Sequence, residues 1–409
     1  MDPLRNPFSP GAGTPPPQLA GRNNLLDQAL MTLARVKRGR SEKSMLLIGL
    51  RGTGKTVLLY EISHLAEKEG YHAIMIEAHE KKTLMEILLP EIRRVLFELE
   101  ASKKTSIKVK RAFRVLKSFF MSLKLSVKIN DIDFGLGIDP EKGVADSGNL
   151  ESDLTQVFVA LGEAAQEHHT AIAIIIDELQ YLHEEELSSL IMAMHKISQK
   201  TLPIVLVGAG LPQLVAKAGR SKSYAERLFD YPELGPLNKK DAKSALQDPV
   251  KREGVSFTEE GIAEIIRVTK GYPYFLQEWG YQAWNIAKKS PIDIHVAKSA
   301  TKASIQRLDQ SFFRVRFDRL TPREKEYLNA LSILGREPQR SGDVAQMLGI
   351  DVRNAAPLRN NLIKKGMIYS PKHGDTAFTV PLFEEFLKRM KGAWFQKHAF
   401  LKVEAARLA

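Results

Sequence analysis

The stretch Gly49-Leu50-Arg51-Gly52-Thr53-Gly54-Lys55-Thr56 matches the phosphate-binding pattern GxxxxGK[ST] at every fixed position. The apolar run at 44–48 before it predicts a short buried strand, and residues 57–68 after it predict an amphipathic helix. Glycines in such a loop let backbone N–H groups close around phosphate oxygens, and the positive N-terminus of the following helix lies beneath them. The stretch therefore predicts a nucleotide-phosphate site.

The chemistry of this loop assigns a role to two of its side chains. Lys55 would reach the β- and γ-phosphates of ATP, which makes it a candidate catalytic residue, and the Thr56 hydroxyl would bind Mg²⁺. The predicted nucleotide-binding residues are Gly49, Leu50, Arg51, Gly52, Thr53, Gly54, Lys55, Thr56, Val57 and, ahead of the first predicted helix, Arg22.

The amino-acid composition limits the number of domains, the cellular compartment and the kinds of partner that we expect. The 409 residues suffice for two or three domains, each with its own hydrophobic core. The absence of cysteine excludes disulfides and suits the cytoplasm, where we expect the protein to act. No apolar run reaches transmembrane length, so no membrane partner is expected. An excess of 60 Lys and Arg over 48 Asp and Glu gives a net charge of +12, which favours polyanions, with nucleic acid ahead of an anionic membrane surface.

A second element of the predicted site follows a strand pattern at 171–176. The run Ala-Ile-Ala-Ile-Ile-Ile is typical of a strand covered on both faces of a parallel sheet, and it ends in Asp177-Glu178. Asp177 would hold Mg²⁺, and Glu178 would act as the general base on the attacking water. An acidic pair after a strand is also common at a helix N-terminus. Downstream of a phosphate loop we predict the catalytic role, and Glu178 favours hydrolysis over nucleotide sensing.

Arg220 and Arg227 lie after the next predicted strand, at 202–210. An arginine finger from this segment could reach the phosphates of a neighbouring subunit in a homo-oligomer, and Arg227 is the favoured candidate. The alternative is that both arginines pair on the surface with Glu226, Asp230 or Glu233.

The composition changes after a helix predicted at 83–99. Residues 101–128 contain nine Lys and Arg and no acidic residue, with Phe113, Phe119 and Phe120 among them. This basic stretch predicts contact with nucleic acid. The alternative is a solvated helix face whose aromatic side chains turn into the core. The alternation over 123–138 predicts a β-hairpin, and residues 139–149 predict an exposed loop.

Helical patterns occupy 238–313, with helices predicted at 239–253, 258–270, 274–288 and 296–313.

The last hundred residues differ because they combine short helices with strand patterns. A capping box at Thr321 begins a helix to 334, and a short helix at 341–349 and a third at 352–365 follow. Residues 367–369 and 376–380 predict a two-stranded wing. Three helices and a hairpin in this order resemble a winged helix-turn-helix.

The third of these helices carries side chains that suit DNA bases and phosphates. They are Arg353, Asn354, Arg359, Asn360, Lys364 and Lys365. Residues 310–409 hold 18 Lys and Arg against 10 Asp and Glu, so the charge favours DNA. Winged helices also serve as protein-binding modules, and that alternative stays open.

Taken together, the phosphate loop, the strand ending in Asp177-Glu178, the helical segment and the C-terminal pattern resemble AAA+ ATPases. More narrowly, they resemble origin-recognition-like initiators and archaeal-type, STAND-related ATPases. The resemblance implies an α/β P-loop NTPase core with a parallel sheet flanked by helices, an all-α lid and a C-terminal winged helix-turn-helix. It implies ATP and Mg²⁺ as ligands, a nucleotide-dependent homo-oligomer, and Pro273 near the adenine. Two features depart from it: the strand end Gly208-Ala209-Gly210 lacks a polar γ-phosphate sensor, and a lid arginine is not evident.

The expected domains are a Pro-rich extended arm at 1–20, an ATPase core at 21–235 with a basic insert at 101–149, a helical lid at 236–315 and a winged-helix domain at 316–409. The expected function is that of an ATP-hydrolysing, DNA-binding molecular switch of the initiator or loader type. The alternatives are a STAND-like signalling or defence regulator that acts through a protein partner, and a transposition or plasmid accessory ATPase.

Overall fold

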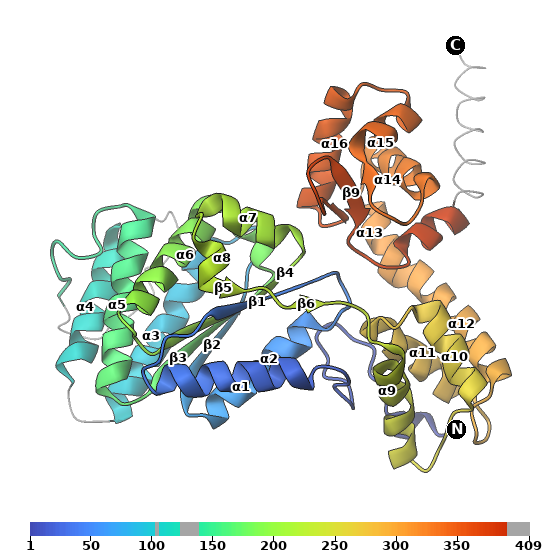
Figure 1. Ribbon diagram of the computed structural model, residues 1–409, viewed down its shortest axis with the longest axis horizontal. Helices are drawn as coiled ribbons and strands as arrows, with labels where there is room; N and C mark the ends of the chain where they lie inside the picture. The colour runs from blue at the N-terminus through green and yellow to red at the C-terminus, as the bar shows by residue number, and fades with distance from the viewer. Residues whose placement is uncertain (103–105, 123–138, 391–409) are drawn as a thin grey trace. The chain divides into compact units, whose positions relative to one another are not determined.

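The computed structural model of the protein describes residues 1–102, 106–122 and 139–390 (Figure 1). The hairpin predicted at 123–138 therefore lies outside the described residues. The chain divides into two compact units. The core unit comprises Arg22–Gly49 and Lys55–Leu234, and the C-terminal unit comprises Met1–Gly21, Leu50–Gly54 and Gly235–Ala409.

A parallel sheet forms the centre of the core unit, as the sequence predicts. Its strands run in the order β2-β3-β4-β1-β5, and β6 also pairs with β1. Every residue of β1, β3 and β4 is buried, which explains why these strands read as unbroken apolar runs. The strands are β1 (Ser44–Gly49), β2 (Tyr71–Glu77), β3 (Ala171–Asp177), β4 (Ile204–Gly210), β5 (Phe229–Asp230) and β6 (Glu233–Leu234).

The register of these strands aligns their carboxyl ends. Ile176 of β3 lies opposite Gly208 of β4, and Ile48 of β1 lies opposite Gly210 of β4. Because parallel strands end at the same edge of a sheet, the ends of β1 and β3 meet there with β4 between them. The edge of the sheet that carries the site is therefore defined by three strand ends.

Helices cover both faces of the sheet (Figure 1). The helices α1 (Asn23–Lys37) and α2 (Lys55–Lys68) pack on one face, and α5 (Leu150–Glu167) and α6 (Glu184–Gln199) pack on the other. The second face holds the main core cluster, which joins Ile172, Ile174 and Ile176 of β3 to these two helices. Two further helices, α3 (Leu84–Ser102) and α4 (Ile107–Ser122), extend this layer beyond α5.

Four helices begin the main part of the C-terminal unit: α9 (Lys239–Arg252), α10 (Glu259–Thr269), α11 (Pro273–Ile286) and α12 (Ile294–Leu308). They follow the predicted pattern closely, except that α12 ends at Leu308. A π-helical turn, η3 (Asp309–Phe313), and α13 (Arg314–Asp318) then continue the chain. The aromatic residues Phe275, Trp279 and Trp284 of α11 are buried, so they belong to the core of this unit.

The last part of the C-terminal unit contains α14 (Pro322–Leu334), α15 (Ser341–Leu348) and α16 (Val352–Lys364). A three-stranded antiparallel sheet accompanies them, with β7 (Gln339–Arg340), β8 (Ile368–Tyr369) and β9 (Asp375–Phe378) in the order β7-β9-β8. The predicted two-stranded wing is present as β8 and β9, and β7, a third strand of two residues that was not predicted, pairs with β9 from a distant segment. A pattern search cannot detect so short a strand.

The N-terminal arm packs on α11 within the same unit. Apart from a short 3-10 helix, η1 (Pro3–Arg5), it contains no regular helix, as its prolines predict. The Phe8 side chain is 2% exposed and lies against Gly280 of α11, where an added Cβ would come within 2.6 Å of the ring. Asn6 Nδ2 donates to Tyr281 O at 3.0 Å, and Trp284 Nε1 donates to Asp2 O at 2.8 Å. The arm is therefore an integral part of this unit's core.

Candidate nucleotide site

The phosphate loop has the conformation that its glycines predict. Gly52 and Gly54 have φ values of +80° and +88°, a region that side chains with a Cβ rarely adopt. Lys55 is the first residue of α2, so the N-terminus of that helix follows the loop directly. The Lys55 side chain is 6% exposed, and its Nζ donates to Gly49 O at 2.9 Å. The ammonium group is thus held back against the loop backbone, at the place where phosphates would lie.

The predicted Mg²⁺ ligands meet at the edge of the sheet. Thr56 Oγ1 on α2 donates to Asp177 Oδ2 at the end of β3, at a distance of 2.5 Å. Asp177 is 4% exposed, and its Oδ1 accepts a hydrogen bond from the Glu178 backbone N–H at 2.7 Å. Burial raises the pKa of Asp177, although the Thr56 hydroxyl and the nearby Lys55 charge act in the opposite direction. A carboxylate held this way gains from a cation beside it.

These residues fit Mg²⁺ bound together with a nucleotide. Among the described residues, no group of three or more His, Asp or Glu could hold a metal ion by itself. Mg²⁺ is usually bound through one or two protein oxygens, with water and substrate phosphates completing its shell. The hydroxyl of Thr56 and the carboxylate of Asp177 are such a pair, and the lysine next to them would neutralise the phosphates.

Glu178 directly follows β3 in a left-handed conformation, with φ of +54°. Residues other than glycine rarely adopt this conformation, and those that do are concentrated at functional sites. A short 3-10 helix, η2 (Leu179–Tyr181), begins immediately after it. The side chain of Gln180 in this turn donates from Nε2 to Glu178 Oε2. Gln180 is not among the predicted site residues; its position three residues after Asp177, together with the later strand that ends in glycines, is the sequence signal that points to it.

The remaining predicted nucleotide residues lie at defined places. Val57 is in the first turn of α2, and Arg22 is the N-cap residue of α1. Pro273 is the first residue of α11 in the C-terminal unit. Arg227 lies in α8 (Ala225–Leu228) and is exposed. Its side chain forms no hydrogen bond or ion pair with a described residue, so the pairing with Glu226, Asp230 or Glu233 is not seen. The roles of these residues stay predictions.

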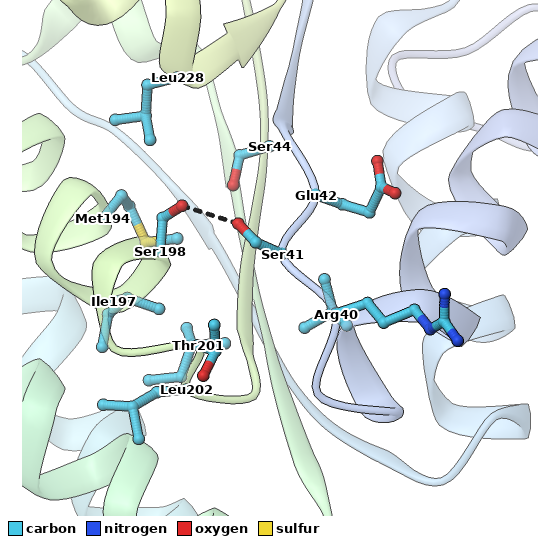
Figure 2. A pocket seen from close by; sticks show the side chains of 12 residues that line it. Arg40, Ser41, Glu42, Ser44, Met194, Ile197, Ser198, Thr201, Leu202 and Leu228 are labelled. Carbon is cyan, nitrogen blue, oxygen red and sulfur yellow. Dashed lines mark hydrogen bonds between the residues drawn. The ribbon is translucent and has the colours of Figure 1, made fainter.

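A small pocket lies at the other edge of the same sheet. Ser44 and Ile204, the first residues of β1 and β4, line it together with Arg40, Met194 and Leu228. Figure 2 shows the hydroxyl groups of Ser41 and Ser198 joined across it by a hydrogen bond of 2.9 Å. Because the phosphate loop follows the carboxyl end of β1, this pocket is separate from the nucleotide site.

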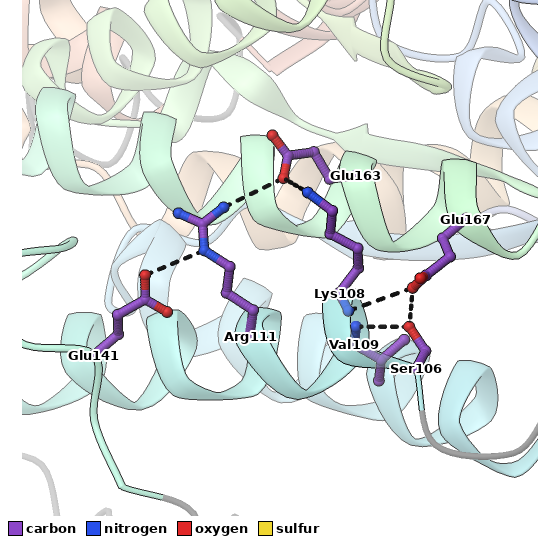
Figure 3. A network of polar contacts seen from close by, with 7 residues as sticks. All are labelled: Ser106, Lys108, Val109, Arg111, Glu141, Glu163 and Glu167. Carbon is purple, nitrogen blue, oxygen red and sulfur yellow. Dashed lines mark hydrogen bonds and ion pairs between the residues drawn. The ribbon is translucent and has the colours of Figure 1, made fainter.

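Within the basic stretch, Ile107–Ser122 form α4, and several cations of this helix are paired within the core unit. Figure 3 shows Lys108 and Arg111 both directed to Glu163, at 2.8 Å and 3.3 Å, and Arg111 also bonded to Glu141 at 3.1 Å. Arg114 reaches Glu141 at 3.7 Å. The other face of α4 is apolar, and Phe113 and Phe119 are buried. These contacts follow the structural alternative for the stretch, and its contact with nucleic acid stays a prediction.

The six predicted DNA-binding residues of α16 fall into two groups. Arg359 donates from Nε to Thr376 Oγ1 at 2.9 Å and from Nη2 to Asp375 O at 3.0 Å, so it holds β9. Lys365, directly after α16, donates from Nζ to Glu324 Oε2 at 2.7 Å. The other four are exposed: Arg353, Asn354, Asn360 and Lys364. The structure therefore ties two of the six into internal contacts.

Comparison with known proteins identifies the first half of the chain. Residues 18–207 match the family model described as AAA ATPase domain. These residues therefore form an AAA ATPase domain. The match spans both the phosphate loop and Asp177-Glu178, and it confirms the predicted resemblance to AAA+ ATPases and the predicted P-loop NTPase core. Residues 310–387 match a second model, described as a domain of unknown function (DUF8462). No curated protein matches the sequence.

Solved structures resemble this chain at low sequence identity. A Walker-type ATPase of Pyrococcus abyssi is 17% identical with a TM-score of 0.57, over 90% of this chain and 96% of that one. The Orc1 protein of Aeropyrum pernix in complex with DNA is 17% identical with a TM-score of 0.45, over 91% and 94%. Cdc6p from Pyrobaculum aerophilum is 16% identical with a TM-score of 0.43, over 95% and 98%. None of the described helices is long and apolar enough to span a membrane.

Proposed function

We propose that this chain is an AAA+ molecular switch that hydrolyses ATP with Mg²⁺ and binds DNA through its C-terminal module. One observation carries the nucleotide half: the hydrogen bond between Thr56 Oγ1 and Asp177 Oδ2, which brings both proposed metal ligands together from α2 and β3. Mg²⁺ bound there with ATP would neutralise the phosphate charge that builds up during transfer.

The proposed roles of the surrounding residues follow from their chemistry. Lys55 exchanges its bond to Gly49 O for the β- and γ-phosphates, which strengthens nucleotide binding through a buried positive charge. Glu178 accepts a proton from the attacking water, since its carboxylate stands directly after the Asp177 carboxylate. In this proposal Asp177 stays ionised and holds the metal.

Two substitutions test the nucleotide half. Lys55→Ala should abolish ATP binding, measured with a fluorescent nucleotide, because it removes the charge that faces the phosphates. Glu178→Gln should keep ATP binding and stop turnover, because an amide cannot accept the proton. Normal hydrolysis by Glu178→Gln would show that another group is the base.

The DNA half rests on the shape and charge of residues 322–378. We propose that α14, β7, α15, α16, β8 and β9, in this order, form a winged helix-turn-helix with α16 as its recognition helix. Arg353 and Lys364 are exposed on α16 and form no ion pair with a described residue. Arginine and lysine in such a place contact phosphates or guanine edges.

A labelled duplex titrated at several salt concentrations tests this half. We expect the logarithm of the affinity to fall linearly with the logarithm of the salt concentration, since phosphate contacts release counterions. Replacing Lys364 with alanine should reduce that slope by about one. Absence of binding, or an affinity that does not depend on salt concentration, would instead favour the alternative function of a regulator that acts through a protein partner. Stimulation of ATP hydrolysis by DNA would separate the two functions further.

A further inference from the structure

The carboxamide of Gln180 bridges the end of β3 to the end of β4. Its Nε2 donates to the carboxylate of Glu178, and its Oε1 accepts from the backbone N–H of Leu211 at 3.1 Å. Leu211 directly follows β4. Only the NH₂ group can donate to a carboxylate, and only the carbonyl oxygen can accept from an N–H. Both partners therefore require the same orientation of the amide, and the flipped orientation would lose both hydrogen bonds.

The glycines at the end of β4 make room for this bridge. A Cβ at Gly208 would lie 2.2 Å from Leu179 Cδ1, and a Cβ at Gly210 would lie 3.0 Å from Gln180 Oε1 and 2.8 Å from Leu214 Cδ2. Side chains on this strand end would thus displace the η2 turn. Gly208-Ala209-Gly210 lacks a polar side chain of its own, and the polar side chain of Gln180 from the η2 turn lies beside it instead.

The backbone of the η2 turn is also held from the far side. Lys217 on α7 (Gln213–Ser221) donates from Nζ to Gln180 O at 3.3 Å and also to Leu182 O. The amide of Tyr181 donates to Glu178 O at 3.0 Å. Because main chain and side chain of Gln180 are both tied, its amide can hold a partner in place rather than follow it.

We propose that Gln180 is a positioning residue for ATP hydrolysis, which holds the Glu178 carboxylate at the end of β4 so that it faces the attacking water. This inference rests on the proposed role of Glu178 as the base. In this proposal, Gln180 of η2 supplies the polar side chain that the end of β4 lacks. Loss of its amide should therefore slow the chemical step and leave nucleotide binding unchanged.

Two replacements of Gln180 remove the contact in different ways. Gln180→Glu keeps the shape and an oxygen that can accept from Leu211 N–H, but it loses the donor to Glu178 and repels that carboxylate. Gln180→Met keeps the length and removes both hydrogen bonds. The matched control is Gln199→Glu, which makes the same change of charge on an exposed residue at the end of α6. Thermal unfolding of each variant shows whether it folds.

Single-turnover hydrolysis and nucleotide binding are then measured on the full chain. We expect both Gln180 variants to hydrolyse ATP roughly 10- to 100-fold more slowly, since a small misplacement of a catalytic group has effects of this order. Their ATP dissociation constants should stay within about threefold of wild type, because the interactions that bind ATP equally in the ground state and the transition state are unchanged. Gln199→Glu should match wild type in both.

The outcomes separate this inference from the proposed function. If Glu178→Gln stops hydrolysis and either folded Gln180 variant still turns over at the wild-type rate, Gln180 does not position the base and the proposed function stands. A rate that falls only in proportion to lost ATP binding would likewise overturn the inference, because it indicates a structural role. If Glu178→Gln itself hydrolyses ATP normally, the proposed base is wrong and the inference falls with it.

Discussion

Lys365 and Glu324 form an ion pair, with 2.7 Å between Nζ and Oε2, that joins the end of α16 to the start of α14. Glu324 is 2% exposed, and the same oxygen accepts from the Thr321 backbone N–H at 2.8 Å in the capping box of α14. Lys364, one residue earlier, is exposed. Two adjacent lysines that look alike in the sequence therefore have different surroundings: Lys365 is paired with a buried carboxylate, and Lys364 forms no ion pair with a described residue.

Replacing these two lysines in turn should separate stability from DNA binding. Lys365→Met should lower the free energy of unfolding by about 1–2 kcal/mol, because it leaves a buried carboxylate without its charged partner. Lys364→Met should leave stability unchanged within about 0.5 kcal/mol and weaken DNA binding. Urea unfolding and duplex titration measure the two effects. Equal stability of the two variants would contradict the pairing.

The same pair predicts a dependence on pH. Burial raises the pKa of Glu324, but hydrogen bonds from Lys365 and Thr321 outweigh burial and leave the pKa below its ordinary value. A carboxyl whose pKa is lower in the folded state stabilises the protein above its unfolded pKa, and this contribution is lost as the pH falls through the folded pKa. The stability difference between wild type and Lys365→Met should therefore shrink below about pH 4. Urea midpoints of both proteins at pH 7 and pH 3.5 check this, and an unchanged difference would refute it.

The N-terminal arm should stabilise the C-terminal unit through Phe8. Phe8→Ala should lower the free energy of unfolding by about 3–5 kcal/mol. Gly280→Ala should lower it by about 1–3 kcal/mol, because the added methyl group clashes with the Phe8 ring. The double variant should cost less than the sum, because the small side chain at 8 makes room for the added methyl group. Chemical unfolding measures all three. Leu4→Ala, at a residue that is 96% exposed, is the control and should change nothing.

The ion pairs of α4 predict that Arg111 contributes to stability more than to DNA binding. Arg111→Met should lower stability by about 0.5–1 kcal/mol, since the pairs with Glu141 and Glu163 are partly exposed. Its effect on duplex affinity should be small beside that of Arg353→Ala. Lys110→Met, at an exposed position of the same helix, is the matched comparison. A loss of affinity with Arg111→Met as large as with Arg353→Ala would restore the basic stretch as a DNA contact.

An arginine finger at Arg227 makes a prediction about mixtures. If Arg227 acts on the nucleotide of a neighbouring subunit, Arg227→Ala should hydrolyse ATP at least about tenfold more slowly, because such an arginine stabilises the transition-state charge. Mixing it with Glu178→Gln should recover activity, since each subunit then supplies what the other lacks. Steady-state hydrolysis over a range of mixing ratios tests this. A mixture no more active than its parts, under conditions where subunits associate, would mean that Arg227 does not act in trans.

Local patterns in the sequence were enough to predict the parallel sheet and the first elements of the candidate site. The buried runs at 44–48 and 171–176 became β1 and β3, and the residues after them, Lys55, Thr56 and Asp177, lie at one edge of the sheet. This succeeds because strand burial, glycine conformation and the polarity of a helix N-terminus each act over a few residues. Once the strands are parallel, their carboxyl ends must share an edge.

Contacts between distant segments were decided by the tertiary structure alone. Lys365 and Arg359 have the side chains of DNA contacts, yet they hold Glu324 and the β9 segment. Phe8, in an arm expected only to be extended, fills a space over Gly280. The spacing of residues along a chain cannot show which cation will find a carboxylate, because that depends on where packing brings two elements together. The sequence thus determined the chemistry available at each position, and the fold decided which groups remain free to use it.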